Sequence, residues 1–245
     1  MNIINQKTEK IMIAVIKNLR KTLSYLLVFT LLFGVSAYIS FSNKTTQAST
    51  PLPRFSVVLD AGHGGVDSGC VGPSGVYERD INLSIAQKLG KMLDILGIKV
   101  TYTRTNEDGL YGIFANGFKK RDMKAREEII HKANANLVVS IHLNSFTSST
   151  ACGAQVFYKL NNDTSKELGQ ALQEMFVEQI EGSRKNCKAG DFYILNCSRS
   201  PAILVECGFL SNPKEEAKLI TSEYQERIAY TIMCGIVEYF GLSQG

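Results

Sequence analysis

Three polar residues end apolar runs of this chain, and their side chains are of types that bind metals or move protons. His63 lies in Asp-Ala-Gly-His-Gly-Gly after one run, His142 ends Val-Val-Ser-Ile-His, and Glu206 ends Ala-Ile-Leu-Val-Glu. A carboxylate at the end of a core strand is costly to bury unless it is paired or close to a metal. Two imidazoles and a carboxylate that converge can bind a catalytic zinc ion, which keeps one coordination position for water. The three residues therefore predict a zinc site.

The elements that must position these residues are apolar strands alternating with amphipathic helices. Because the strands are apolar on both faces, we expect an α/β fold with a twisted, largely parallel sheet of about six strands and helices on both faces. Such sheets hold their ligands beyond the carboxyl ends of the strands. The expected strands are 55–59, 98–103, 137–142, 154–158, 192–195 and 202–207, and the expected helices are 82–96, 119–135 and those beginning near 164, 213 and 222.

Helix starts can be predicted from capping residues. Thr164-x-x-Glu167 and Ser222-x-x-Gln225 have the spacing of capping boxes, and Pro213 after Asn212 suits the first position of a short helix. His131 lies on the polar face of the helix expected at 119–135, and we expect it to be solvated.

The net charge of +4 belongs to an N-terminal arm. Residues 1–48 carry six of the 27 basic residues and one of the 23 acidic ones, so the chain from Ser49 onward has a net charge of −1. A neutral domain removes the only support for nucleic-acid binding.

An uncharged stretch at 22–43 follows this arm, and its apolar part, 23–41, is about long enough to cross a bilayer as a helix. Basic residues before such a segment stay in the cytoplasm, which predicts an exported chain that contacts the membrane through a signal peptide or an anchor. Cleavage after Ala48 and retention as an anchor both remain open. We expect the basic arm with signal or anchor at 1–48, a linker at 49–54 and a catalytic domain at 55–242. Six cysteines permit disulfides, and buried free thiols are the alternative.

A series of motifs in this chain resembles, in family order, the zinc-dependent N-acetylmuramoyl-L-alanine amidases of the amidase type 3 family. The resemblance spans about 55–240 and implies hydrolysis of the amide between the lactyl group of N-acetylmuramic acid and L-alanine of the stem peptide in peptidoglycan. The motifs are Asp60-Ala-Gly-His-Gly-Gly-x-Asp-x-Gly, Glu78 in Val-Tyr-Glu-Arg-Asp, Thr103-Arg104, Arg126 before Ala133-Asn134, Ser140-Ile-His-Leu-Asn and Val205-Glu-Cys-Gly-Phe.

The resemblance also implies roles for individual residues. It implies one Zn²⁺ ion held by His63, Glu78 and His142, with Glu206 as the catalytic base. Glu206 is then not the third ligand that the strand ends alone suggest. Cys207 follows Glu206 on a strand, so we expect its thiol on the opposite face, away from the metal.

Within this family the chain resembles the spore-cortex amidases of endospore-forming bacteria. The segments that carry this finer likeness are Lys119-Lys-Arg-Asp, Gly153-Ala-Gln-Val-Phe-Tyr and Ser200-Pro-Ala-Ile-Leu-Val-Glu. The likeness implies a role in spore cortex and germination, as the first step toward muramic δ-lactam, at the forespore envelope. A vegetative cell-wall amidase, a silent peptidoglycan-binding module and a zinc peptidase remain alternatives, and the need for an accessory protein partner is open.

Overall fold

The structure is a computed structural model that describes Leu23, Thr30 and residues 55–241. The signal or anchor segment predicted within 1–48 and the linker predicted at 49–54 otherwise lie outside these residues. Among the described residues, no helix combines the length and apolar character that a membrane span requires.

A six-stranded sheet forms the centre of the described domain, in the order β2-β1-β3-β6-β4-β5. All neighbouring strands are parallel except β4 and β6. The prediction of a largely parallel α/β sheet is therefore confirmed. The strands are β1 (Ser56–Ala61), β2 (Lys99–Tyr102), β3 (Leu137–Asn144), β4 (Gln155–Lys159), β5 (Lys188–Gly190) and β6 (Ala202–Phe209).

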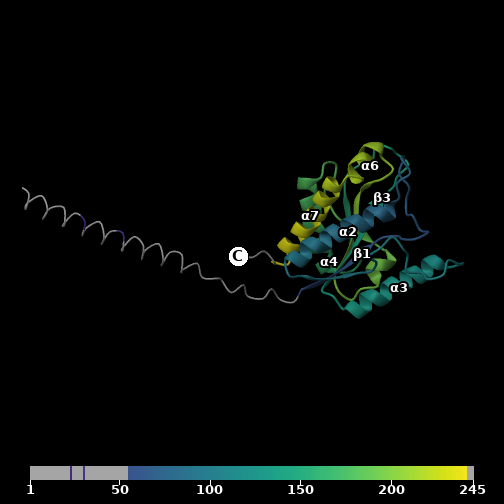
Figure 1. Ribbon diagram of the computed structural model, residues 1–245, viewed down its shortest axis with the longest axis horizontal. Helices are drawn as coiled ribbons and strands as arrows, with labels where there is room; N and C mark the ends of the chain where they lie inside the picture. Colours follow the sequence, from purple (N-terminus) through teal and green to yellow (C-terminus); the bar gives the residue numbers. More distant parts are fainter. Residues whose placement is uncertain (1–22, 24–29, 31–54, 242–245) are drawn as a thin grey trace, which may run out of the picture. The chain divides into compact units, whose positions relative to one another are not determined.

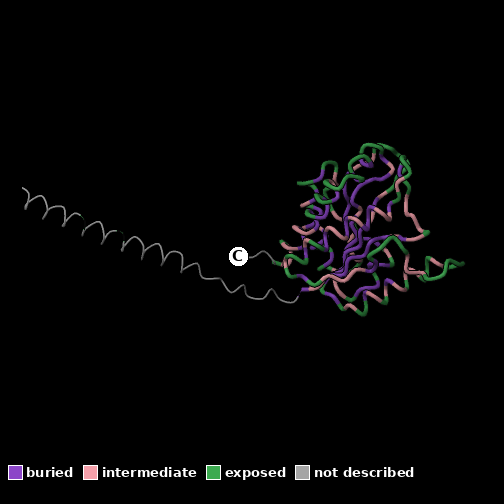
Figure 2. Tube along the Cα trace, in the orientation of Figure 1, coloured by how far each residue is buried: buried purple, intermediate pink, exposed green. Residues whose placement is uncertain are grey.

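Helices cover both faces of the sheet, as expected (Figure 1). On one face, α2 (Glu78–Ile95), α4 (Asp163–Gln179) and α7 (Ser222–Tyr239) pack over the larger apolar cluster. On the other face, α3 (Phe118–Ala133) and the short α5 (Tyr193–Asn196) cover a smaller one. The short α6 (Pro213–Leu219) follows β6. Figure 2 shows the buried chain concentrated in the sheet between these layers.

Alternation along the strands decides which face receives the polar residues. Val58, Val138 and Leu204 belong to the smaller cluster on the α3 side. Successive side chains of a strand point to opposite faces, so residues two or four positions further along share that side. His142 and Glu206 therefore lie on the α3 side, where they are also neighbours in the pairing of β3 with β6. Cys207 belongs to the opposite, larger cluster, as predicted.

One predicted strand is wrong. In the run 192–195, Phe192 precedes α5 as its N-cap, and the other three residues belong to this single helical turn, which buries Ile194 and Leu195. The sixth strand is instead β5, a short edge strand that pairs with β4 and carries no apolar run.

The predicted capping boxes are also displaced by one or two residues. The side chain of Asn162, not Thr164, accepts the capping bond of α4, and Thr221 rather than Ser222 caps α7. The prediction for α6 is confirmed, because Asn212 caps it and Pro213 is its first residue.

Candidate metal centre

Three side chains from separate elements meet at the carboxyl ends of β1 and β3. His63 follows β1, Glu78 is the first residue of α2, and His142 lies in β3. One nitrogen or carboxylate oxygen from each lies within 4.8 Å of the others. Glu78 Oε1 is 3.3 Å from His63 Nε2 and 3.0 Å from His142 Nδ1. Two imidazole nitrogens and a carboxylate oxygen are a donor set that fits a zinc ion with three protein ligands.

Glu78 is held in place by backbone and side-chain donors. Its Oε1 accepts hydrogen bonds from Leu143 N at 3.0 Å and from Asn82 Nδ2 at 3.1 Å, and its Oε2 accepts one from Cys70 N at 2.9 Å. Burial raises the pKa of Glu78, but hydrogen bonds and charges from His142 and His63 outweigh it and leave the pKa well below its usual range. The group is therefore ionised, as a metal-binding carboxylate must be.

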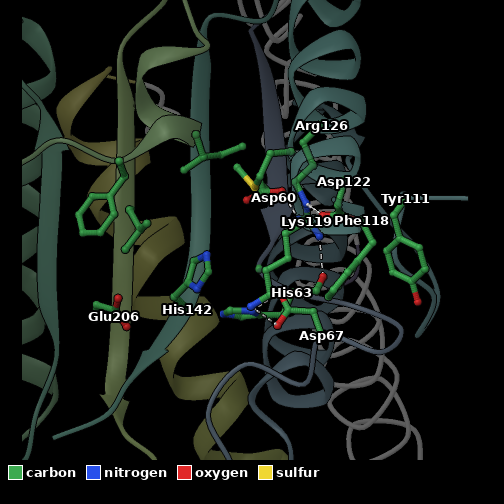
Figure 3. A pocket seen from close by; sticks show the side chains of 15 residues that line it. Asp60, His63, Asp67, Tyr111, Phe118, Lys119, Asp122, Arg126, His142 and Glu206 are labelled. Atoms are coloured by element: carbon green, nitrogen blue, oxygen red, sulfur yellow. Dashed lines mark hydrogen bonds and ion pairs between the residues drawn. The ribbon is translucent and has the colours of Figure 1, made fainter. Parts of the chain in front are cut away.

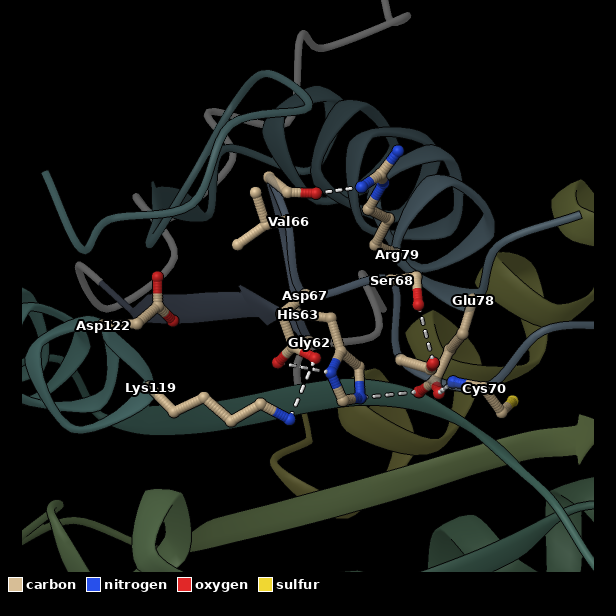
Figure 4. Close-up of polar contacts among 12 residues, drawn as sticks. Gly62, His63, Val66, Asp67, Ser68, Cys70, Glu78, Arg79, Lys119 and Asp122 are labelled. Atoms are coloured by element: carbon tan, nitrogen blue, oxygen red, sulfur yellow. Dashed lines mark hydrogen bonds and ion pairs between the residues drawn. The ribbon is translucent and has the colours of Figure 1, made fainter. Parts of the chain in front are cut away.

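A carboxylate behind His63 orients its ring. His63 Nδ1 is 2.9 Å from Asp67 Oδ2, and Lys119 Nζ is 3.1 Å from Asp67 Oδ1 (Figure 4). With Nδ1 bonded to Asp67, Nε2 is the nitrogen that faces Glu78. Burial lowers the pKa of His63, but hydrogen bonds to Asp67 and Glu78 raise it to about 9. The bond to His63 lowers the pKa of Asp67. Such carboxylate–histidine pairs fix the orientation of metal-binding imidazoles.

Two glycines leave the space that the ligand side chains fill. A Cβ at Gly62 would lie 2.2–2.6 Å from atoms of the His142 ring, and a Cβ at Gly69 would lie 2.5 Å from Glu78 Oε2. His63 itself has a φ of 64°, a conformation that costs a non-glycine residue energy and that occurs at functional sites. The glycine-rich segment 62–69 therefore packs directly against the ligand side chains.

Two buried arginines bind the backbone carbonyl groups of residues 61–63, where the glycine-rich segment begins. Arg126 donates to the carbonyl oxygens of Ala61 at 2.8 Å and His63 at 2.5 Å. Arg104 donates to those of Ala61 at 2.9 Å and Gly62 at 3.0 Å. The backbone before and at His63 is thus held by charge-assisted hydrogen bonds on three consecutive residues.

The buried charge of Arg126 is balanced by Asp60. Asp60 Oδ1 lies 2.5 Å from Arg126 Nη1, and both side chains are 2% exposed. Burial raises the pKa of Asp60, but Arg126 and hydrogen bonds from Ser140 and Thr103 lower it below its usual value. Asp60 therefore stays ionised and compensates the buried guanidinium.

Glu206 lies beside the cluster but is bonded differently. It pairs with His142 in the sheet register, and its Oε2 is buried without a hydrogen-bond partner among the described residues. Burial raises the pKa of Glu206 to about 7; the charge of Glu78 adds to the rise, and His142 and His63 oppose it. A carboxyl group with this pKa can both accept and release a proton near neutral pH.

A cavity of about 290 Å³ links these groups to α3 (Figure 3). Glu206 and His142 lie at one end of it, and Tyr111 and Phe118 lie at the other. Apolar side chains complete its walls: Met123, Phe192, Ile194 and Leu204.

The remaining candidates lie outside the cluster. His131 is exposed, as predicted, but its Nε2 lies 2.7 Å from the carbonyl oxygen of Cys197. All six cysteines are free. Burial raises the pKa of Cys70, the cysteine nearest to Glu78, so its thiol stays protonated.

The family motifs include Asp67, Arg104 and Arg126, but the sequence predicts no role for any of them. A signal for Arg126 was available, because helical spacing places it between Met123 and Ile130 on the inward stripe of α3. For Asp67 no helical or strand periodicity points to the role, because the glycine turn alone brings its carboxylate to His63.

Comparisons with known proteins point to one family. Residues 57–238 match the family model described as N-acetylmuramoyl-L-alanine amidase. The chain is 34% identical to the germination-specific N-acetylmuramoyl-L-alanine amidase of Bacillus subtilis, over 90% of this chain and 94% of that protein.

Solved structures are similar as well. The CwlD amidase from Clostridioides difficile, in complex with the GerS lipoprotein, has a TM-score of 0.73 and 38% identity over 77% of this chain and all of that one. The catalytic domain of CwlV, an amidase from Paenibacillus polymyxa, has a TM-score of 0.67 and 34% identity over 77% of this chain and 99% of that one.

Proposed function

The chain belongs to the N-acetylmuramoyl-L-alanine amidase family, and on that premise we propose that it hydrolyses the amide between the lactyl group of N-acetylmuramic acid and L-alanine of the stem peptide, with one zinc ion as cofactor. The observation that carries the proposal is the meeting of His63, Glu78 and His142 beside an unpartnered carboxylate oxygen of Glu206.

His63, Glu78 and His142 are the proposed zinc ligands. The chemistry that such an ion supplies is polarisation of the amide carbonyl and a pKa for the attacking water lowered from about 15.7 to about 7. Asp67 keeps the Nε2 atom of His63 free for binding by occupying Nδ1. Support for zinc rests on the donor set, and Gly62 and Gly69 leave the room that His142 and Glu78 need to join it.

Glu206 is the proposed catalytic base. It accepts a proton from the water that attacks the carbonyl carbon, and it delivers that proton to the alanine nitrogen as the C–N bond breaks. One water is consumed, and the products are a free lactyl carboxylic acid and a peptide with a free N-terminus. The pKa of about 7 suits a group that performs both transfers in one turnover.

Mass spectrometry of digested muropeptides tests this assignment. We expect disaccharides that carry a free lactyl acid and peptides that begin with alanine. Peptides cleaved between two amino acids, with the lactyl amide intact, would contradict it and favour a zinc peptidase. A chain that binds zinc and peptidoglycan but releases no product would favour a binding module.

The setting that we propose is the spore cortex. The similarity to a germination-specific amidase supports it, and removal of the stem peptide is the first step toward muramic δ-lactam. We expect spores that lack this protein to lose the δ-lactam from their muropeptide profile. An unchanged profile, with altered vegetative walls, would assign the chain to the vegetative wall instead.

Action outside the cytoplasmic membrane follows from the substrate. We propose that 1–48 delivers the catalytic domain, 55–242, across the membrane, with 49–54 as a linker. N-terminal sequencing of the protein from membrane and soluble fractions tests this. A new terminus at Ser49 indicates cleavage, an intact arm in the membrane fraction indicates an anchor, and an intact chain in the cytoplasm would contradict export.

An accessory protein partner is the remaining proposal. It is supported by the similar CwlD structure, which contains the GerS lipoprotein. We expect the purified chain to cleave peptidoglycan slowly by itself and faster with extract from sporulating cells. Equal rates with and without extract would contradict a partner.

A further inference from the structure

The segment 110–118, called here the apolar projection, carries large hydrophobic side chains that no other described element covers. Ile113 is 85% exposed and Phe114 is 63% exposed. Figure 1 shows the chain extending beyond the N-terminal end of α3, and Figure 2 shows its tip as exposed. Clustered exposed apolar side chains on a soluble domain commonly mark a binding surface.

The apolar projection is held in one conformation by its own contacts. Arg121 donates hydrogen bonds to four of its carbonyl oxygens, at 2.8–3.3 Å. The rings of Tyr111, Phe114 and Phe118 pack edge to face, with centroids 5.1–6.5 Å apart. Ile113 and Phe114 are therefore presented by a preformed support, which reduces the entropic cost of binding.

The base of the apolar projection is continuous with the candidate active site. Tyr111 and Phe118 line the same cavity as His63 and Glu206 (Figure 3). Tyr111 Oη also accepts a hydrogen bond of 2.9 Å from Val66 N, in the loop that carries His63. A polymer whose scissile bond lies at Glu206 can thus continue along the cavity onto the apolar projection.

The chemistry of the apolar projection fits a sugar polymer that carries carboxylates. Aromatic and aliphatic side chains pack against the apolar faces of sugar rings and against acetamido methyl groups. Lys120, next to the apolar projection, is exposed, and none of the ion pairs within 55–241 includes it, so it can meet a carboxylate of the stem peptides. Two exposed apolar side chains are few for a stable protein–protein interface, which covers about 800 Å² on each partner.

We propose that the apolar projection binds the glycan strand of peptidoglycan next to the muramic acid whose amide is cleaved, and that it thereby favours polymeric over monomeric substrate. This inference rests on the proposed function and adds a binding surface outside the cavity.

The test compares wild-type full-length protein in detergent with the double variant Ile113→Ser, Phe114→Ser. The matched control is Ile95→Ser, because Ile95 is 84% exposed but ends α2, about 26 Å along the helix from Glu78. Two rates are measured, one on purified insoluble peptidoglycan and one on a soluble disaccharide-peptide monomer. Co-sedimentation with the insoluble polymer measures binding without catalysis.

We expect the double variant to lose at least about fivefold in polymer rate and in co-sedimentation, since packing against an aromatic side chain contributes about that factor. Its monomer rate should stay within twofold of the wild type, and the control should match the wild type throughout. Unchanged co-sedimentation and polymer rate would overturn the inference, including the case in which a protein binds there instead. A wild-type chain that cleaves neither substrate would contradict the proposed function, while co-sedimentation would still decide the inference.

Discussion

The two faces of the sheet differ in what their side chains do. The face under α2, α4 and α7 is apolar and holds the larger core cluster. The face under α3 and α5 has a smaller cluster and accommodates Asp60, Arg126, His142 and the cavity. Burial of apolar surface stabilises a fold, whereas buried charges must be paired before they cease to destabilise it. This domain therefore derives its stability mainly from the face under α2, α4 and α7, whereas the candidate active site lies on the face under α3 and α5.

The largest effect on activity should follow a substitution on the face under α3 and α5 that leaves the proposed metal ligands intact. Glu206→Gln should lower muropeptide cleavage by about 10²- to 10⁴-fold, because it removes a proton acceptor and donor. The zinc content should stay at the wild-type level, as measured by elemental analysis. The control is Glu226→Gln, at an exposed position of α7. A variant that cleaves at the wild-type rate would remove Glu206 from the mechanism.

A substitution on the face under α2, α4 and α7 should instead lower stability and leave activity nearly unchanged. Leu172→Ala, at a fully buried position of α4 packed against Gly235, should lower the free energy of unfolding by about 2–5 kcal/mol. The value of kcat should stay within about twofold while the chain remains folded. Ile194→Ala, which lines the cavity, should affect KM more than Leu172→Ala does. If Leu172→Ala lowered kcat strongly at unchanged stability, the division between the faces would fail.

The pH dependence of stability sharpens the comparison. In the metal-free chain the pKa of His63 is about 9 against an ordinary 6.5, so its pairing stabilises the fold below pH 6.5 and is lost as pH rises through 9. The free energy of unfolding should therefore fall by up to about 3 kcal/mol between pH 6.5 and 9.5. Asp67→Asn should reduce this fall, as measured by denaturant unfolding. A stability that rises over this range would contradict the pairing.

The smallest effect concerns the carboxylate that orients His63. Asp67→Asn should weaken zinc binding by about 10- to 100-fold, since partners behind a metal-binding imidazole contribute this much. Chelator competition measures the affinity, and Asp108→Asn, an exposed neighbour bonded to Asn106, is the control. Equal affinities for Asp67→Asn and the wild type would show that the contact between Asp67 and His63 contributes nothing to zinc binding.

The core strands could be predicted because their residues leave few alternatives. Runs such as 137–142 and 202–207 are short, rich in Val and Ile, and bounded by turns or helices, which is typical of buried parallel strands. The run 192–195 is equally apolar, and periodicity cannot separate a buried strand from a buried helical turn over four residues. The strand β5 has no apolar pattern, because it lies at the sheet edge and pairs through its backbone.

The residues of the candidate site could likewise be predicted only in part from sequence patterns. His142 and Glu206 could be found because polar residues are unexpected at the end of an apolar strand. Without the family resemblance, the strand ends alone would predict Glu206 rather than Glu78 as the third ligand. Strand patterns do not reveal Glu78 as the ligand, because it reaches the two imidazoles only after the 16-residue loop 62–77, between β1 and α2, returns the chain to them. That return depends on turn geometry at several glycines, including Gly69.

Zinc stoichiometry tests the central claim most directly. Native mass spectrometry of the full-length chain in detergent should detect one zinc ion per wild-type chain and none in His142→Ala. His131→Ala should keep its zinc, because that imidazole bonds to the carbonyl of Cys197 away from the cluster. Full zinc retention by His142→Ala, or loss of zinc from His131→Ala alone, would contradict the account.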